Sequence, residues 1–245
     1  MNNSKYNLLA MGSCRICAAL NNYQNTYNTW GETGSRHLNP KCIIGRSWSI
    51  NEQLELLKLI KGDKPFAEYA GCEYPDIENI KDNLLFLGRK FNQIDAIVVE
   101  VSSLRYYKNK DNKLIHNIMH NNKNSSIIKD MSSEEFEVTT KNFVEYSEKP
   151  IFFVSHFDRK SKPYREVIWD YLKKISTEYK NVFLIDPSIM PNLQTTKNRE
   201  HYTRKGEDIA SEYIGGIISQ TLHRILRRRN HETLRILGTN LENKL

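Results

Sequence analysis

The chain has 245 residues, 39% hydrophobic and 27% charged, which is enough apolar material for a core and excludes a chain that is disordered throughout. The formal net charge is +7, but residues 221–245 carry six Lys or Arg against two Glu, a surplus of four positive charges. Because the rest of the chain is close to balanced, overall charge is only a weak indication of nucleic-acid binding.

All four cysteines, Cys14, Cys17, Cys42 and Cys72, lie in the first third of the chain. The apolar run at 8–11 is too short for the core of a secretory signal, and no apolar stretch approaches the ~18 residues that span a bilayer. We therefore expect a cytoplasmic protein with reduced thiols and no transmembrane segment.

The first elements are indicated by short apolar runs. Residues 6–11 form such a run, ended by Gly12, which predicts a buried strand, and 14–20 predict the helix after it. Residues 21–41 are polar and turn-rich, which predicts a loop. A short strand or turn is expected at 42–44.

The middle of the chain predicts two amphipathic helices and a central strand. Residues 50–60 and 77–91 repeat apolar side chains at three- and four-residue intervals, which is typical of helices. The run IDAIVVEV at 94–101 is almost continuous and β-branched, so we expect a parallel strand buried on both faces. The polar segment at 105–131 then indicates an insertion or lid.

The last third alternates helices with short strands. Helices are expected at 132–146, which opens on a capping box, and at 164–179, and strands at 151–154 and 182–185. A final helix is expected from residue 206, interrupted at Gly215-Gly216 and followed by a basic helix. We expect one α/β domain over 1–220 and a basic helix or tail over 221–245.

This order predicts a three-layer α/β/α fold with a mostly parallel sheet of about five strands. Ligands of such sheets bind at the carboxyl ends of the strands. Ser13 follows the first strand at the start of a helix, where backbone N–H groups favour developing negative charge. It could be a nucleophile whose own N–H serves an oxyanion hole, or simply a helix N-cap.

A histidine near the last helix is the natural partner for that serine. His201 lies in a loop before the helix, from which it could reach across the strand ends and act as a general base. Considered alone, it could equally be a solvent-exposed loop histidine.

Together the two segments resemble the SGNH/GDSL hydrolase superfamily, in particular variants with a Gly-Ser-Cys first block. The matching residues are Gly12-Ser13-Cys14 and His201-Tyr202-Thr203-Arg204-Lys205-Gly206 with Ala210. The resemblance implies a flavodoxin-like fold of SGNH type and a serine esterase that forms an acyl-enzyme on an ester or acylated carbohydrate. O-acyl transfer in glycan modification is the alternative. No cofactor and no metal are expected, and the oligomeric state stays open.

The resemblance also assigns the rest of the site. Gly45 matches the glycine that donates an N–H to the oxyanion, and Ser102 or Ser103 would replace the asparagine of the third block. Arg15 and His156 lie at strand ends and are candidate substrate-binding residues, although His156 could equally be a structural histidine.

The acidic residue that would orient the catalytic histidine departs most from the family pattern. Asn198 occupies the usual aspartate position three residues before the histidine, and an amide cannot stabilise an imidazolium electrostatically. Asp186 after the last strand is the preferred substitute, Glu200 is a second, and a Ser–His dyad is a third. These departures also leave room for a non-catalytic binding module on the same fold.

Other patterns indicate other chemistry. Cys14-Arg15-Ile16-Cys17 is a CxxC at a helix start, which fits a redox thiolate, or Cys14 could be the nucleophile with His201. Zinc is less favoured, because Cys42 and Cys72 have no closely spaced pair and His116 and His120 lack an intervening Glu. The basic helix at 222–235 could bind an anionic partner, nucleic acid included, or form a solvated face.

Overall fold

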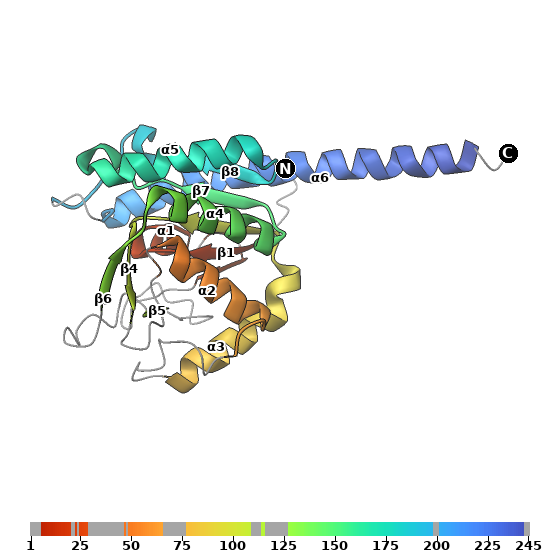
Figure 1. The fold of residues 1–245 in the computed structure, drawn as a ribbon. Coiled ribbons are helices and arrows are strands. Elements are labelled where there is room, and N and C mark those ends of the chain that lie inside the picture. Colours follow the sequence, from red (N-terminus) through yellow and green to blue (C-terminus); the bar gives the residue numbers. More distant parts are fainter. Residues whose placement is uncertain are drawn as a thin grey trace.

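A five-stranded parallel sheet forms the centre of the computed structural model (Figure 1). The structure describes residues 6–20, 23, 25–28, 47, 49–65, 77–108, 114–115, 127–197 and 201–242. The strands are β1 (Asn7–Met11), β2 (Asn25–Asn28), β3 (Ala96–Glu100), β7 (Ile151–Val154) and β8 (Val182–Ile185). Their order, β2-β1-β3-β7-β8, is the flavodoxin-like order. The chain adds β2 on one side of β1 and then adds β3, β7 and β8 on the other side, so the strand order reverses between β1 and β3.

Helices cover both faces of this sheet, which confirms the predicted three-layer α/β/α class. On one face lie α1 (Cys14–Leu20) and α6 (Arg204–Glu242). On the other lie α2 (Ile50–Lys61), α3 (Ile77–Lys90), α4 (Ser133–Ser147) and α5 (Pro163–Glu178). The described part of the chain also contains the short 3-10 helices η3 (Phe91–Gln93), η5 (Arg159–Ser161) and η6 (Pro187–Ile189).

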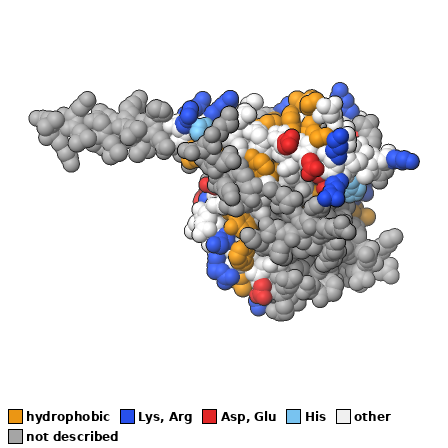
Figure 2. All heavy atoms as spheres, turned by 180° about the vertical axis from the view of Figure 1, so that it is seen from behind, with side chains coloured by type: hydrophobic (Ala, Val, Ile, Leu, Met, Phe, Trp, Pro, Cys, Tyr) orange, Lys and Arg blue, Asp and Glu red, His pale blue; other side chains and the backbone are white. Residues whose placement is uncertain are grey.

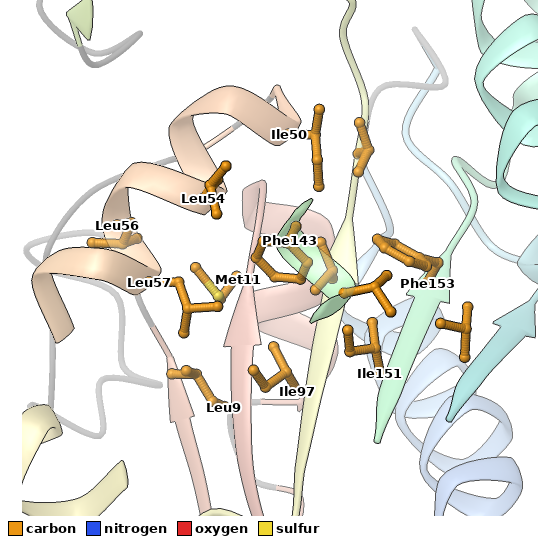
Figure 3. Packing of buried hydrophobic residues seen from close by; sticks show 14 of the residues in the cluster. Leu9, Met11, Ile50, Leu54, Leu56, Leu57, Ile97, Phe143, Ile151 and Phe153 are labelled. Carbon is orange, nitrogen blue, oxygen red and sulfur yellow. The ribbon is translucent and has the colours of Figure 1, made fainter. Parts of the chain in front are cut away.

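The two cores follow from the alternation of side chains along each strand. In β1, Leu9 and Met11 point toward α2 and α4 (Figure 3), whereas Leu8 and Ala10 pack against the α1 and α6 layer. In β3 all five side chains are buried, as expected for a strand with helices on both sides. Glu100 ends that strand on the α1 side of the sheet.

The predicted polar insertion contains a second, smaller sheet. Its strands are β4 (Arg105–Lys108), β5 (Leu114–Ile115) and β6 (Ile127–Asp130), antiparallel in the order β5-β4-β6. The Met131 N–H donates to the Leu104 carbonyl at 2.9 Å and closes the base of the insertion. The sequence predicted the insertion but not its strands.

The loop predicted at 21–41 contains β2, which pairs with β1 at the edge of the main sheet. Its sequence, Asn-Thr-Tyr-Asn, is too short and polar to show an apolar run, so the hydrophobic pattern could not reveal it. The strand predicted at 42–44 lies outside the described residues.

The predicted interruption at Gly215-Gly216 was wrong, because α6 is one continuous helix of 39 residues. A Cβ on Gly215 would lie 2.2 Å from the Tyr23 ring, and the Tyr23 hydroxyl donates to the Gly215 carbonyl at 2.6 Å. Gly215 therefore leaves space for the Tyr23 ring to pack against α6, and the helix continues without a break.

Beyond its packed first half, α6 continues away from the sheet as a single rod (Figure 1). It runs through the boundary expected at 220/221. Among the α6 side chains that the structure describes, the last ones in the core cluster are Leu222 and the partly buried Ile225. None of the helices in the described part of the chain is both long and apolar enough to cross a lipid bilayer.

Candidate active site at the carboxyl edge of the sheet

The turn after β1 is built around Gly12. Its φ is +139°, and a Cβ there would lie 2.9 Å from the carbonyl oxygen of Glu100, so a larger residue would be both strained and too close. The Ser47 N–H donates to the Gly12 carbonyl at 3.3 Å from the other side. The turn is therefore pressed against the end of β3, and Ser13 comes to lie beside Glu100.

Ser13, Arg15 and Glu100, here the Ser13 trio, form one buried cluster. The Ser13 hydroxyl donates to Glu100 Oε2, and Arg15 Nε donates to Glu100 Oε1 at 2.7 Å. The backbone N–H of Arg15 donates to Ser13 Oγ at 3.2 Å. Because Ser13 is 1% and Glu100 2% exposed, these contacts compensate a carboxylate that burial alone would destabilise.

Sequence reasoning missed Glu100. The signal was present, because a charged residue near the end of an otherwise apolar strand is rarely buried without a partner. Gln53 of α2 fixes the same strand end by donating from Nε2 to the carbonyls of Glu100 at 2.9 Å and Ser47 at 3.2 Å.

Ser155, Arg159 and Asp186, here the Ser155 trio, form a second cluster farther along the same edge. Asp186 accepts from the Ser155 hydroxyl at 2.9 Å and from Arg159 Nη2 at 2.9 Å. It also caps η6 by accepting from the Ser188 N–H at 3.0 Å. His201 is not among its partners, so the role of Asp186 as the acid stays a prediction.

The surroundings of Asp186 lower its pKa. Burial would raise that pKa, but the hydrogen bonds from Ser188 and Ser155 and the charge of Arg159 outweigh it. Arg159 also pairs with Glu166 of α5 at 2.5 Å, and its guanidinium lies 5.4 Å from the Trp169 ring centroid. Asp186 is therefore a firmly ionised part of a structural network.

His156, directly after Ser155, is buried between the two trios. Its Nδ1 accepts from the Asp158 N–H at 2.9 Å, so the neutral ring carries its proton on Nε2. Burial, followed by the positive charges of Arg15, Arg165 and Lys162, lowers its pKa to about 2. At neutral pH His156 is an uncharged side chain and can donate a hydrogen bond but not act as a cation.

The structure brings the His201 segment to the same edge. His201 itself is exposed, and its carbonyl accepts from the Thr196 N–H at 2.9 Å. The next residue, Tyr202, is buried with its ring 4.7 Å from that of Phe157, and burial and the charge of Glu100 raise its pKa. Ser13 Oγ nevertheless takes Glu100, and not His201, as its hydrogen-bond partner.

An open cavity of about 710 Å³ lies beside the Ser13 trio. Arg15 lines it together with the two predicted strand-end serines, Ser102 and Ser103. The remaining walls come from the insertion and from the start of α5: Leu104, Arg105, Tyr107, Asp130, Met131, Lys162, Tyr164 and Arg165. Ser13 itself is not in the lining, although Arg15, two residues further along the chain, is.

Several sequence-predicted residues fall outside the described part of the structure: Gly45, Cys42, Cys72, His116, His120, Asn198 and Glu200. Cys17 is buried, and its thiol donates to the Ala10 carbonyl with an S···O distance of 3.9 Å. Among the described residues, no group of three or more His, Cys, Asp or Glu side chains is arranged to hold a metal ion.

Comparison of the chain with protein-family models, with curated proteins and with solved structures gives no match. The functional proposal therefore depends on the fold and on the geometry of this edge.

Proposed function

We propose that the chain is a serine-dependent enzyme of ester or acyl-group chemistry, similar in its site to SGNH/GDSL hydrolases. The observation that carries the proposal is the position of Ser13. Its hydroxyl lies where the strand order reverses, held between Glu100 and the Arg15 N–H and next to a cavity of about 710 Å³.

In the proposed reaction, Ser13 Oγ forms a bond to the acyl carbon of an ester while its proton passes to His201. The ester C–O bond then breaks, and His201 returns the proton to the leaving alkoxide. Water, or a sugar hydroxyl in a transferase, attacks the acyl-enzyme and restores Ser13. The N–H groups of Ser13 and Gly45 are the proposed oxyanion donors.

Glu100 gives this site a feature beyond the family pattern. Its carboxylate holds the Ser13 hydroxyl before attack, so Ser13 exchanges Glu100 for His201 when substrate binds. Asp186 would have to give up Ser155 or Arg159 to orient His201, whereas a Ser–His dyad needs no such exchange. The dyad is therefore the simpler form of the proposal.

A non-catalytic binding module is the second candidate. The observation that favours it is the 1% exposure of Ser13, whose hydroxyl is engaged by Glu100. In such a module the edge would bind an acylated sugar in the cytoplasm without cleaving it.

A basic face on α6 supports a separate proposal, an anionic partner bound along 222–235. Arg224, Arg227 and Arg228 are exposed there, and basic side chains gather where the helix leaves the body (Figure 2). Retention on a heparin column should fall as salt rises and should decrease when these three residues are changed to Gln.

The decisive test of the enzyme proposal is labelling by a fluorophosphonate probe, followed by intact mass. Wild type should gain one probe, and Ser13→Ala and His201→Ala should not. Ser176→Ala on α5 and the exposed His223→Ala on α6 are matched controls that should label like wild type. Circular dichroism melting verifies that each variant is folded, and a folded wild type that does not label would favour the binding module.

A further inference from the structure

The cavity beside the Ser13 trio has a strong charge bias. Of the described residues that line it, Arg15, Arg105, Lys162 and Arg165 are basic and only Asp130 is acidic. Asp130 is 72% exposed and lies 3.2 Å from Arg105 Nε, and Glu100 behind the wall pairs with Arg15. Among the described lining residues, four basic side chains therefore share the cavity with one acidic side chain.

The basic groups come from separate parts of the chain and converge on one space. Arg105 belongs to β4 of the insertion, Arg15 to α1, and Lys162 and Arg165 to the start of α5. Arg165 is buried and fixed, since its Nη1 donates to the Asp158 carbonyl at 3.1 Å and the Ser161 hydroxyl at 3.0 Å. These acceptors orient the guanidinium but carry no formal charge.

The charges of Arg15, Arg165 and Lys162 all act on His156, whose pKa they lower after burial has done so. Because Arg15, Lys162 and Arg165 also line one cavity, their charges add to a positive field at this edge. A concave wall of one sign concentrates that field and favours an anion.

Two tyrosines add a surface of another kind. Tyr107 of β4 and Tyr164 of α5 both line the cavity, and the Arg165 guanidinium lies 5.9 Å from the Tyr164 ring centroid. A tyrosine ring presents a flat apolar face and a polar tip, which suits a ligand with C–H groups on one face and hydroxyls at its rim.

We infer that this cavity binds an anionic carbohydrate, with its phosphate, sulfate or carboxylate group among Arg105, Lys162 and Arg165. As a statement about substrate, the inference rests on the proposed function, because it places the acylated sugar beside Ser13. Binding of the anion does not require catalysis, so it can be measured separately from enzyme activity.

The test is isothermal titration calorimetry of the full chain with glucose 6-phosphate, glucose 6-sulfate and glucuronate, with glucose as the neutral ligand and inorganic phosphate as the bare anion. At least one anionic sugar should bind about tenfold or more tightly than glucose and than inorganic phosphate, and added NaCl should weaken it. Which sugar binds identifies the anionic group.

Variants locate the binding. Arg105→Gln with Lys162→Gln, two exposed residues, should weaken the anionic sugar about tenfold or more, since each loses a charged contact. Lys160→Gln removes one positive charge from an exposed neighbour outside the cavity lining and should keep wild-type affinity.

Equal binding of all sugars, no binding, or equal weakening by Lys160→Gln would overturn the inference. Inorganic phosphate that binds as tightly as the sugars would overturn its carbohydrate part. Fluorophosphonate labelling separates the two proposals. Labelling of Ser13 without anion binding leaves the enzyme and removes this substrate class, whereas anion binding without labelling leaves a binding module.

Discussion

The two trios at the carboxyl edge of the sheet share a design and differ in their surroundings. Each joins a serine at a strand end, an arginine and a carboxylate on the neighbouring strand. In the Ser13 trio the arginine borders an open cavity, whereas in the Ser155 trio Arg159 is held by Glu166 and lies over Trp169. Of the two arginines, Arg15 lines the described cavity of about 710 Å³ and Arg159 does not.

This difference shows that residue types do not by themselves identify a site. The Ser13 trio contains the more buried carboxylate, since Glu100 is 2% exposed and the Asp186 side chain 15%. It also lies where the strand order reverses, the position at which parallel sheets open to ligands. Four experiments can break or sharpen the comparison.

The largest expected effect is on turnover of an aryl ester. Ser13→Ala should lower kcat/KM by about 10⁴-fold or more because the nucleophile is lost. Ser155→Ala should change it less than about threefold, since Ser155 contacts Asp186 away from the cavity. Equal losses in the two variants would show that the trios act together.

The next effect is on stability. Glu100→Ala should lower the free energy of unfolding by about 3 to 5 kcal/mol, because it leaves Arg15 largely buried without its carboxylate. Asp186→Ala should cost about 1 to 2 kcal/mol, because Arg159 keeps Glu166. Urea unfolding at neutral pH measures both, and the reverse order would contradict the comparison of burial.

The lowered pKa of His156 predicts that the free energy of unfolding depends on pH. Its folded pKa of about 2 lies below the ordinary 6.5, so the unfolded chain takes up a proton that the folded chain does not. This contribution to stability is present above the ordinary pKa and is lost as pH falls below it.

Between about pH 7 and about pH 5.5 the free energy of unfolding should fall by about 1 kcal/mol, and His156→Gln should remove that part of the slope. Urea unfolding at each pH measures it. The exposed His223→Gln is the control. A variant with the wild-type slope would show that His156 is protonated in the folded state.

The smallest effect separates the two arginines. Lysine at position 15 keeps a charge but loses the planar contact to Glu100, so Arg15→Lys should raise KM for an anionic aryl ester about fivefold. Arg159→Lys should leave KM unchanged and lower stability by about 1 kcal/mol. Steady-state kinetics at two ionic strengths would distinguish the two causes. A change in KM that comes from the electrostatic field at the cavity should depend on salt, and one that comes from altered side-chain packing should not.

Hydrophobic pattern predicted most of the fold, because β3, β7 and β8 are apolar runs and α2, α4 and α5 have amphipathic or capped sequences. It could not predict β2, whose four polar residues gain their strand from pairing with β1. It also misjudged Gly215, because only the Tyr23 ring explains that glycine.

Sequence position predicted which residues share the carboxyl edge of the sheet, but it did not predict which of them contact one another. Strand ends identified Ser13, Arg15, His156 and Asp186 as residues of one edge, since topology alone brings them there. Which serine meets which carboxylate depends on the close approach of Gly12 to Glu100, and no spacing in the sequence encodes that approach.

The walls of the cavity come from different parts of the chain, and some of these residues can be replaced with less disturbance of the Ser13 trio than others. Arg15 belongs to the element that holds Ser13, and replacing it disturbs the buried carboxylate. Arg105, Tyr107 and Asp130 come from the small antiparallel sheet, which leaves and rejoins the body near Leu104 and Met131. If the cavity binds the proposed ligand, new ligand preferences can therefore be selected, in evolution or in the laboratory, by exchanging this small sheet while the edge that holds Ser13 is inherited intact.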